Sequence, residues 1–185
     1  MPLDWDEHYR INPDVHGGPT PLLMEVTEMV PPGRALDLAC GPGRHALYLA
    51  KLGWQVTAID SSHEAIRQLR EQARAAGVTV DAHVANLEDG EFVPEAGAYD
   101  LICNFFYLQR DLFPKIRESL RPGGVFAGAI HLIDEVPCAR PHNPSFVLQP
   151  GELRREFDGW KILYYSEGIE PGHKRPAARI IARRA

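Results

Sequence analysis

The sequence has few cysteines, no long apolar run and no excess of positive charge. Its 185 residues include three cysteines, at positions 40, 103 and 138, and none form a Cys-x-x-Cys pair. That number and spacing argue against a disulfide framework and a zinc knuckle. No apolar run approaches the ~20 residues that a membrane-spanning helix needs. The opening MPLDWDEHYR is charged and lacks the apolar core of a signal peptide. We therefore expect a cytoplasmic protein with reduced thiols and no membrane partner.

The net charge of −5 argues against a nucleic acid as the main partner, because nucleic-acid-binding domains carry a basic stripe. Basic residues do gather in the last segment, residues 173–185 (HKRPAARIIARRA). Apolar residues alternate through that segment, which favours a strand with one solvated face. The length suits one domain over residues 1–185, with an N-terminal arm and helix in 1–33 and the core in 34–185.

From residue 34 onward, strand-like and helix-like periods alternate five times, and two strand-like runs then follow in succession. The runs expected as strands are 34–39, 54–60, 78–85, 99–106, 125–133, 160–169 and 177–185. Right-handed crossovers lay the first five down as a parallel sheet covered by helices. The last two lack a helix between them, so we expect them to pair antiparallel. The fold class is therefore α/β: a doubly wound, Rossmann-like, seven-stranded sheet, mostly parallel, with an antiparallel C-terminal hairpin edge.

A glycine-containing turn joins the first strand to the first helix of this core, within residues 35–50 (ALDLACGPGRHALYLA). Ligands of such sheets bind at the carboxyl ends of the strands, where the strand order reverses. Gly41 and Gly43 lack Cβ atoms, so we expect a ligand to approach the backbone closely there. Ala39 and Pro42 keep the turn narrow.

Two acids discriminate between the cofactors that share this geometry. Asp60 ends the second strand, where both carboxylate oxygens can accept hydrogen bonds from ribose hydroxyls. Residues 41–46 also fit G-x-G-x-x-G/A, the dinucleotide fingerprint. Asp37, however, would repel the pyrophosphate of a dinucleotide. It favours S-adenosylmethionine instead, which carries an ammonium and a sulfonium and no phosphate.

At this point the chain resembles a family. The segments LDLACGPGRHALYLA (36–50) and VTAID (56–60) look like the first two motifs of class I S-adenosylmethionine-dependent methyltransferases. YDLICNFFYL (99–108) and LRPGGVF (120–126) look like later motifs of the same class, in the same order. The resemblance covers residues 34–185 and implies that the antiparallel final strand inserts into the sheet. Ala39 departs from it, since many members carry glycine there.

The resemblance implies a role for each matching position. Asp37 would bear on the methionine end of the cofactor and Asp60 on its ribose. The residues implied in cofactor binding are Asp37, Ala39, Cys40, Gly41, Gly43, Asp60, Ser61, Asn86, Leu87 and Asn104. Ser61, Asn86 and Leu87 would meet the adenine, and Asn104 would face the methyl group. Two alternatives stay open, because Asn86 is equally well an ordinary turn residue and His45 an ordinary surface residue. Cys40 has no evident basic partner and is expected to be a small loop residue, not a nucleophile.

The methyl acceptor is expected to be a small molecule. Residues 104–111 (NFFYLQRD) lack the D/N-P-P-Y/F pattern typical of nucleic-acid methyltransferases. Together with the WDEHYR opening, the motifs look most like the tellurite-resistance and thiopurine-type small-molecule methyltransferases, which implies a thiol or a chalcogen oxyanion. Candidates for binding the acceptor are Tyr9, Arg10, Tyr107, Arg110 and Arg140.

His131, at the end of the fifth strand, is the candidate catalytic residue. His131, Cys138 and His142 are rejected as a metal cluster, because their spacing is irregular and a fourth ligand is missing. We therefore expect no metal. Two alternatives to a methyltransferase remain: a cofactor-binding sensor or accessory subunit, and a nicotinamide-dependent oxidoreductase. The protein is expected to be a monomer or a homodimer.

Overall fold

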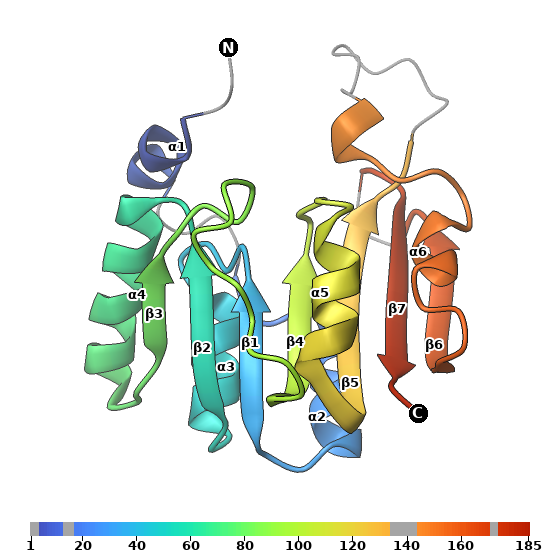
Figure 1. The fold of residues 1–185 in the computed structure, drawn as a ribbon. Coiled ribbons are helices and arrows are strands. Elements are labelled where there is room, and N and C mark those ends of the chain that lie inside the picture. The colour runs from blue at the N-terminus through green and yellow to red at the C-terminus, as the bar shows by residue number, and fades with distance from the viewer. Residues whose placement is uncertain (1–3, 13–16, 134–143, 171–173) are drawn as a thin grey trace.

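The computed structural model of the protein describes residues 4–12, 17–133, 144–170 and 174–185. One sheet organises the fold, with the strand order β3-β2-β1-β4-β5-β7-β6 (Figure 1). Its strands are β1 (Arg34–Leu38), β2 (Gln55–Asp60), β3 (Asp81–Val84), β4 (Tyr99–Phe105), β5 (Leu120–His131), β6 (Lys161–Gly168) and β7 (Ala177–Arg183). The first five are parallel. β7 lies antiparallel between β5 and β6. The predicted fold class, including the inserted final strand, is confirmed.

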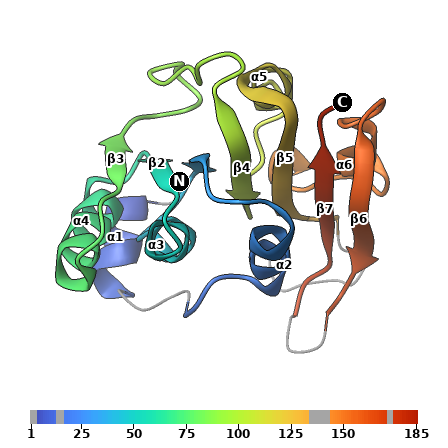
Figure 2. The same ribbon diagram turned by 90° about the horizontal axis from the view of Figure 1, so that it is seen from below.

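Helices cover both faces of the sheet (Figures 1 and 2). They are α1 (Trp5–Ile11), α2 (Pro21–Met29), α3 (Arg44–Lys51), α4 (His63–Ala76), α5 (Leu112–Ser119) and the one-turn α6 (Glu152–Arg155), with a 3-10 turn at Pro144–Phe146. Apolar side chains of α2, α3 and α4 pack on one face. Those of α5 and α6 pack on the other. Because both faces are covered, β4 is buried along its whole length, as its near-continuous apolar sequence predicts.

The helix boundaries follow local rules that the sequence carries. Ser62 is the N-cap of α4, where its hydroxyl accepts a hydrogen bond from the amide of Ala65 at 3.0 Å. Gly77 ends that helix in the left-handed conformation. Pro114 lies in the first turn of α5, where a missing amide costs little.

α1 was not predicted as a helix. Asp4 caps it by accepting hydrogen bonds from the amides of Asp6 and Glu7, and the helix then packs against α4. Isolated helices as short as this are marginal in water, so the packing supplies the stability that the local sequence lacks.

The order of the sheet reverses between β1 and β4, because the chain crosses from the β3 side to the β5 side there. The carboxyl ends of β1, β2 and β4 therefore meet at one edge, the usual ligand position in such sheets. No helix among the described residues is long and apolar enough to cross a membrane. Within the same residues, no group of three or more His, Cys, Asp or Glu side chains is suited to a metal ion.

Candidate active site

The loop that follows β1 is held in a narrow conformation by its own backbone. The amide of Cys40 donates to the carbonyl of Ile59 at 2.9 Å, and the amide of Gly43 donates to the carbonyl of Cys40 at 3.1 Å. Three of its residues have positive φ: Ala39 (51°), Gly41 (54°) and Gly43 (87°). Alanine at such a position is strained, because its Cβ approaches the following carbonyl oxygen.

The space that the two glycines leave is filled by this chain's own side chains. A Cβ on Gly41 would lie 2.9 Å from the hydroxyl oxygen of Tyr9. A Cβ on Gly43 would lie 2.2 Å from Cδ1 of Leu69, on α4. Internal packing therefore requires glycine at Gly43 whether or not a ligand lies against the loop backbone, as the sequence predicts. At Gly41 the close neighbour is an aromatic ring from α1.

Asp60 lies at the end of β2 with 7% of its surface exposed. Its Oδ2 accepts from the amide of Gly41 at 2.8 Å, and its Oδ1 accepts from the amide of Ser62 at 2.9 Å. Burial raises the pKa of this carboxyl above its ordinary value, although both amides act in the opposite direction. An ionised carboxylate accepts about four hydrogen bonds. The backbone of Ser61 also donates to this carboxyl, so Asp60 keeps acceptor capacity for about one ribose hydroxyl.

Asp37 is almost fully buried near the end of β1, with 1% of its surface exposed. The amide of Ala46 bonds to it, but its Oδ2 has no hydrogen-bond partner among the described residues. Burial raises the pKa of Asp37 to about 7, against the nearby positive charge of Arg44. A buried carboxylate oxygen without a partner is costly unless a ligand satisfies it. The ammonium or sulfonium of S-adenosylmethionine is a suitable partner.

A second acceptor of this kind lies on the neighbouring strand. Asn104 is 1% exposed, and its Oδ1 also lacks a partner in the described part of the chain. Asn104 pairs with Leu38 in the parallel register, one residue beyond Asp37. Two predicted cofactor residues thus bring unsatisfied oxygens to adjacent strand ends at the reversal of the sheet.

The residues expected at the adenine differ from Asp37 and Asn104, because the polar side chain of Asn86 already has hydrogen-bond partners. Asn86 is occupied within its own turn, where Nδ2 donates to Asp89 at 2.6 Å and Oδ1 accepts from the amide of Glu88 at 3.0 Å. These bonds favour its alternative interpretation as a turn residue. Leu87 is buried, and its carbonyl accepts from Gln109 at 3.2 Å. Ser61 is exposed beside the carboxyl end of β2.

α1 lies against the glycine loop and the start of α4. Tyr9 is 7% exposed, whereas its neighbour Arg10 points to solvent. Oδ1 of Asp6 accepts from the hydroxyl of Ser62 at 2.6 Å and from the amide of Glu64 at 3.0 Å. The backbone carbonyl of Tyr9 accepts from Gln68 at 2.9 Å. Of these two candidates for binding the acceptor, Tyr9 lies beside the glycine loop and Arg10 is exposed.

Two residues expected to bind the acceptor have structural partners. Nε of Arg110 lies 2.6 Å from Oε1 of Glu152, and the same guanidinium donates to the carbonyls of Ser145 and Val147. Arg110 therefore ties residues 145–152 to the loop after β4. The hydroxyl of Tyr107 donates to Oε1 of Gln109 at 2.8 Å.

The acceptor candidate Arg140 lies outside the described residues, as do Cys138 and His142 of the rejected metal cluster. Cys40 is buried, and burial raises the pKa of its thiol well above the ordinary value. This agrees with the expectation that it is not a nucleophile. Burial and the charge of Asp37 have the same effect on the pKa of Cys103.

His131 ends β5 and is half-buried. Its ring centroid lies 4.9 Å from that of Phe106, which directly follows β4. Phe106 has a φ of 64°, a rare conformation for a bulky residue. Strain of this kind is found preferentially at functional sites, where surrounding contacts hold it.

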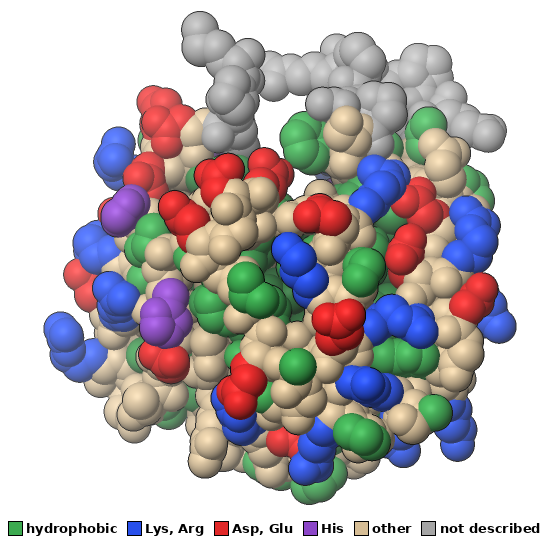
Figure 3. Space-filling view, viewed as in Figure 1, with side chains coloured by type: hydrophobic (Ala, Val, Ile, Leu, Met, Phe, Trp, Pro, Cys, Tyr) green, Lys and Arg blue, Asp and Glu red, His purple; other side chains and the backbone are tan. Residues whose placement is uncertain are grey.

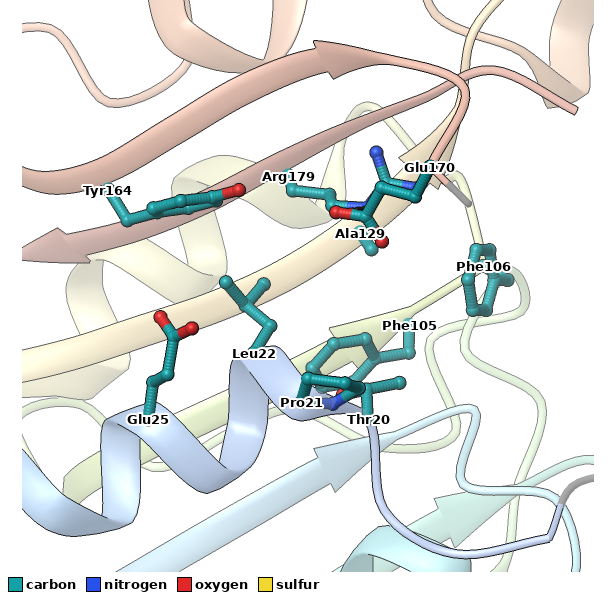
Figure 4. A pocket seen from close by; sticks show the side chains of 10 residues that line it. All are labelled: Thr20, Pro21, Leu22, Glu25, Phe105, Phe106, Ala129, Tyr164, Glu170 and Arg179. Atoms are coloured by element: carbon teal, nitrogen blue, oxygen red, sulfur yellow. Dashed lines mark ion pairs between the residues drawn. The ribbon is translucent and has the colours of Figure 1, made fainter. Parts of the chain in front are cut away.

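A pocket lies between α2 and the carboxyl ends of β4 and β5 (Figure 4). Phe105 and Phe106 line it from the end of β4, and Arg179 from β7. The ring of His45 lies 4.3 Å from that of Phe105, and its Nε2 accepts from the amide of Thr20 at 3.4 Å. His45 is 3% exposed, which decides against its interpretation as a surface residue.

Comparison with known proteins identifies the family. The family model of the tellurite resistance protein TehB matches residues 7–182. The chain belongs to the TehB family. A relative from Haemophilus influenzae, named probable S-adenosyl-L-methionine-dependent methyltransferase TehB, is 29% identical over 174 residues. The match covers 86% of this chain and 56% of the relative, so the chain spans little more than half of that relative's length.

Solved structures share the fold. The crystal structure of TehB from Haemophilus influenzae has a TM-score of 0.79 at 22% identity, over 98% of this chain and 67% of that one. An N1-methyltransferase from Burkholderia thailandensis, solved with 1,6-didemethyltoxoflavin and S-adenosylhomocysteine, has a TM-score of 0.70 at 17% identity, over 98% and 86% of the two chains. The predicted resemblance to class I methyltransferases of the tellurite-resistance type is confirmed.

Two features of this TehB-family chain escaped the sequence analysis. The contact of Leu69 with Gly43 joins α4 to the loop before α3, and no local sequence pattern predicts it. The alternation of basic and apolar residues in the last segment predicts that Arg179 lies on a solvated face, but only 5% of its surface is exposed. The one available signal was its position among Ala177, Ala178, Ile180 and Ile181 in a strand that is buried on both faces.

Proposed function

We propose that the protein transfers a methyl group from S-adenosylmethionine to a small-molecule acceptor. The observation that carries the proposal is the buried carboxylate of Asp37, whose Oδ2 lacks a partner among the described residues beside the glycine loop. An anion in this position suits a cationic ligand and opposes a pyrophosphate. When bound, S-adenosylmethionine supplies a methyl group on a sulfonium that is already an activated leaving group.

The residues of the site have distinct proposed tasks. Asp37 and Asn104 meet the methionine end, Asp60 holds the ribose, and the backbone of residues 39–43 lines the cofactor. Asn86 and Leu87 flank the adenine through their loop, with Ser61 beside them. Because the leaving group is activated, the protein mainly has to hold the reacting atoms in line and exclude water. The buried rings of His45 and Phe105 fit the second task.

For the acceptor we propose a soft nucleophile, either a thiol or a chalcogen oxyanion, since such groups need little general base. His131 is the proposed catalytic group, as a hydrogen-bond donor when protonated or a base when neutral. On the face shown in Figure 3, acidic and basic side chains are interspersed, which is unlike the basic stripe of a nucleic-acid-binding surface.

Calorimetry with S-adenosylmethionine, S-adenosylhomocysteine and NAD tests the cofactor. We expect the first two to bind and NAD not to bind. NAD binding would overturn the proposal in favour of an oxidoreductase. A screen for release of S-adenosylhomocysteine across thiols, selenite, tellurite and small amines then tests turnover. Cofactor binding without turnover on any of them would indicate a sensor or accessory subunit.

A further inference from the structure

The pocket beside α2 combines an apolar wall with one buried cation. Its apolar side is formed by Pro21, Leu22, Phe105, Phe106 and Ala129. Arg179 reaches it from β7, opposite Ala129 in the antiparallel register, and Glu170 lies beside it (Figure 4). Its cavity volume is about 80 Å³, so a pocket of this composition suits only a small organic molecule, or one end of a larger one, with one charged group.

Arg179 is held by the protein backbone. Its Nη1 donates to the carbonyls of Gly168 and Ala177, both at 3.2 Å. Its Nε lies 2.9 Å from Oε1 of Glu170. No hydrogen bond of its Nη2 to any described residue is present, so the guanidinium keeps donor capacity.

The two partners of this ion pair are unequally buried. The Arg179 side chain is 6% exposed and the Glu170 side chain 42%. The cation is therefore already desolvated and oriented, whereas the carboxylate lies at the rim. A buried arginine needs a counter-anion, but nothing in its geometry requires that the anion belong to the protein. Preorganised guanidinium groups bind carboxylates well because little further order has to be imposed.

We propose that this pocket binds the methyl acceptor, that the acceptor is a small organic anion, and that its carboxylate replaces Glu170 on Arg179. The proposal rests on the proposed function and names its substrate class. The apolar wall favours an organic body over a bare inorganic oxyanion, which would leave that wall in contact with water. Arg179 is then a specificity-determining residue.

The position of the pocket fits this role. His45 packs on Phe105 at its wall, and the next residue, Ala46, supplies the amide that bonds Asp37. Neighbouring residues of α3 thus contact the pocket residue Phe105 and the proposed cofactor residue Asp37. The hydroxyl oxygen of Thr20, which lines the pocket, is buried without a partner in the described part of the chain. It is available to a polar group of the acceptor.

The other two charged side chains of the pocket, Glu25 and Glu170, are negative. Glu25 lines it from α2 but is exposed, so water screens its repulsion of an anion. Glu170 competes directly for Arg179. This competition gives an unusual expectation: removal of the Glu170 charge should strengthen binding of an anion, while removal of the Arg179 charge should weaken it.

The test uses matched probes on the protein loaded with S-adenosylhomocysteine, so that it does not depend on turnover. Binding of 3-phenylpropionate and of its uncharged amide is measured by calorimetry. We expect the carboxylate to bind about 10-fold more tightly or better, the scale of a charged hydrogen bond. Arg179→Gln should abolish that preference, and Glu170→Gln should increase it. Arg154→Gln, at an exposed arginine of α6, is the control and should change nothing.

Equal binding of the two probes, or no binding of either, would overturn the proposal. A preference for the carboxylate that survives Arg179→Gln would also overturn it. So would selenite binding that is as tight and depends equally on Arg179, because selenite has no organic body to contact the apolar wall. If Arg179→Gln does not fold, Glu170→Gln decides, because a merely structural ion pair predicts weaker or unchanged anion binding. Affinity for S-adenosylmethionine is measured in every variant. If the wild-type protein does not bind S-adenosylmethionine, the proposed function is wrong, whether or not the two probes bind.

Discussion

The carboxylate of Asp60 accepts a hydrogen bond from the amide of Gly41 at 2.8 Å, which ties the end of β2 to the loop after β1. Its other oxygen holds the amide of Ser62, at the start of α4. One side chain therefore fixes three elements at the edge where the cofactor is proposed to bind. This gives Asp60 a structural task that is independent of any ribose.

Replacement of Asp60 should consequently lower both stability and cofactor affinity. We expect Asp60→Ala to weaken S-adenosylmethionine binding by about 1.5–3 kcal/mol and to destabilise the fold by a similar amount, the scale for hydrogen bonds to a charged acceptor. Calorimetry and urea unfolding measure the two effects. Asp81→Ala, at an exposed acid of β3, is the control. Lost stability with unchanged affinity would leave Asp60 only its structural task.

Gly43 should be far less tolerant of alanine than Gly77. Both have positive φ, at 87° and 67°, so both substitutions carry the cost of a left-handed alanine, about 1–2 kcal/mol. Only at Gly43 would the new Cβ meet a core atom, Cδ1 of Leu69, whereas Gly77 faces open space. Overpacking adds about 1–3 kcal/mol. Equal losses for the two variants in urea unfolding would contradict the packing argument.

Much of this fold and part of the site were predictable because they depend on local patterns. Strand and helix periods, the cap at Ser62 and the ending at Gly77 depend on neighbours in sequence. Asp37 and Asp60 were predictable from their positions at strand ends. The other features of the fold and site depend on contacts between segments that are distant in sequence. α1 is stabilised by packing against α4, and Arg110 forms an ion pair with Glu152 from a later segment. No local pattern reports such partners.

Ala39 offers a substitution that should be tolerated or stabilising. Its φ of 51° costs alanine about 1–2 kcal/mol, which glycine avoids. The greater freedom of glycine in the unfolded chain returns about 0.4–1 kcal/mol of that gain. We therefore expect Ala39→Gly to stabilise the protein by up to about 1 kcal/mol. Ala50→Gly, inside α3, should destabilise it by about 1 kcal/mol. Thermal unfolding of the two variants tests this prediction. A similar loss of stability in both would show that the backbone at Ala39 is not strained.

His131→Ala should lower turnover at saturating cofactor and leave cofactor affinity unchanged, because His131 ends β5 beside Phe106 and away from Asp60. The pH profile separates its two proposed tasks. A protonated histidine that holds an anion loses affinity as pH rises, whereas a neutral histidine that accepts a proton gains rate. His83→Ala, at an exposed histidine of β3, is the control. Full activity of His131→Ala on every accepted substrate would reduce His131 to a strand-end residue.

Cofactor affinity should depend on the ionisation of Asp37. Burial raises its pKa from 3.8 to about 7, so the ligand-free protein loses stability as pH rises from about 4 to 7, where the folded state holds a proton that the unfolded state releases. A cationic ligand favours the carboxylate. Affinity for S-adenosylmethionine should therefore rise as pH increases from 6 towards 8. Binding at pH 6 should also release a proton, which calorimetry in buffers of different ionisation enthalpy detects.

The control variant is Asp37→Asn, which keeps the shape of the side chain but removes its titration. The same variant corrects for ionisation of the cofactor's own amino group. A pH dependence that is identical in Asp37→Asn would show that Asp37 only secures the amide of Ala46.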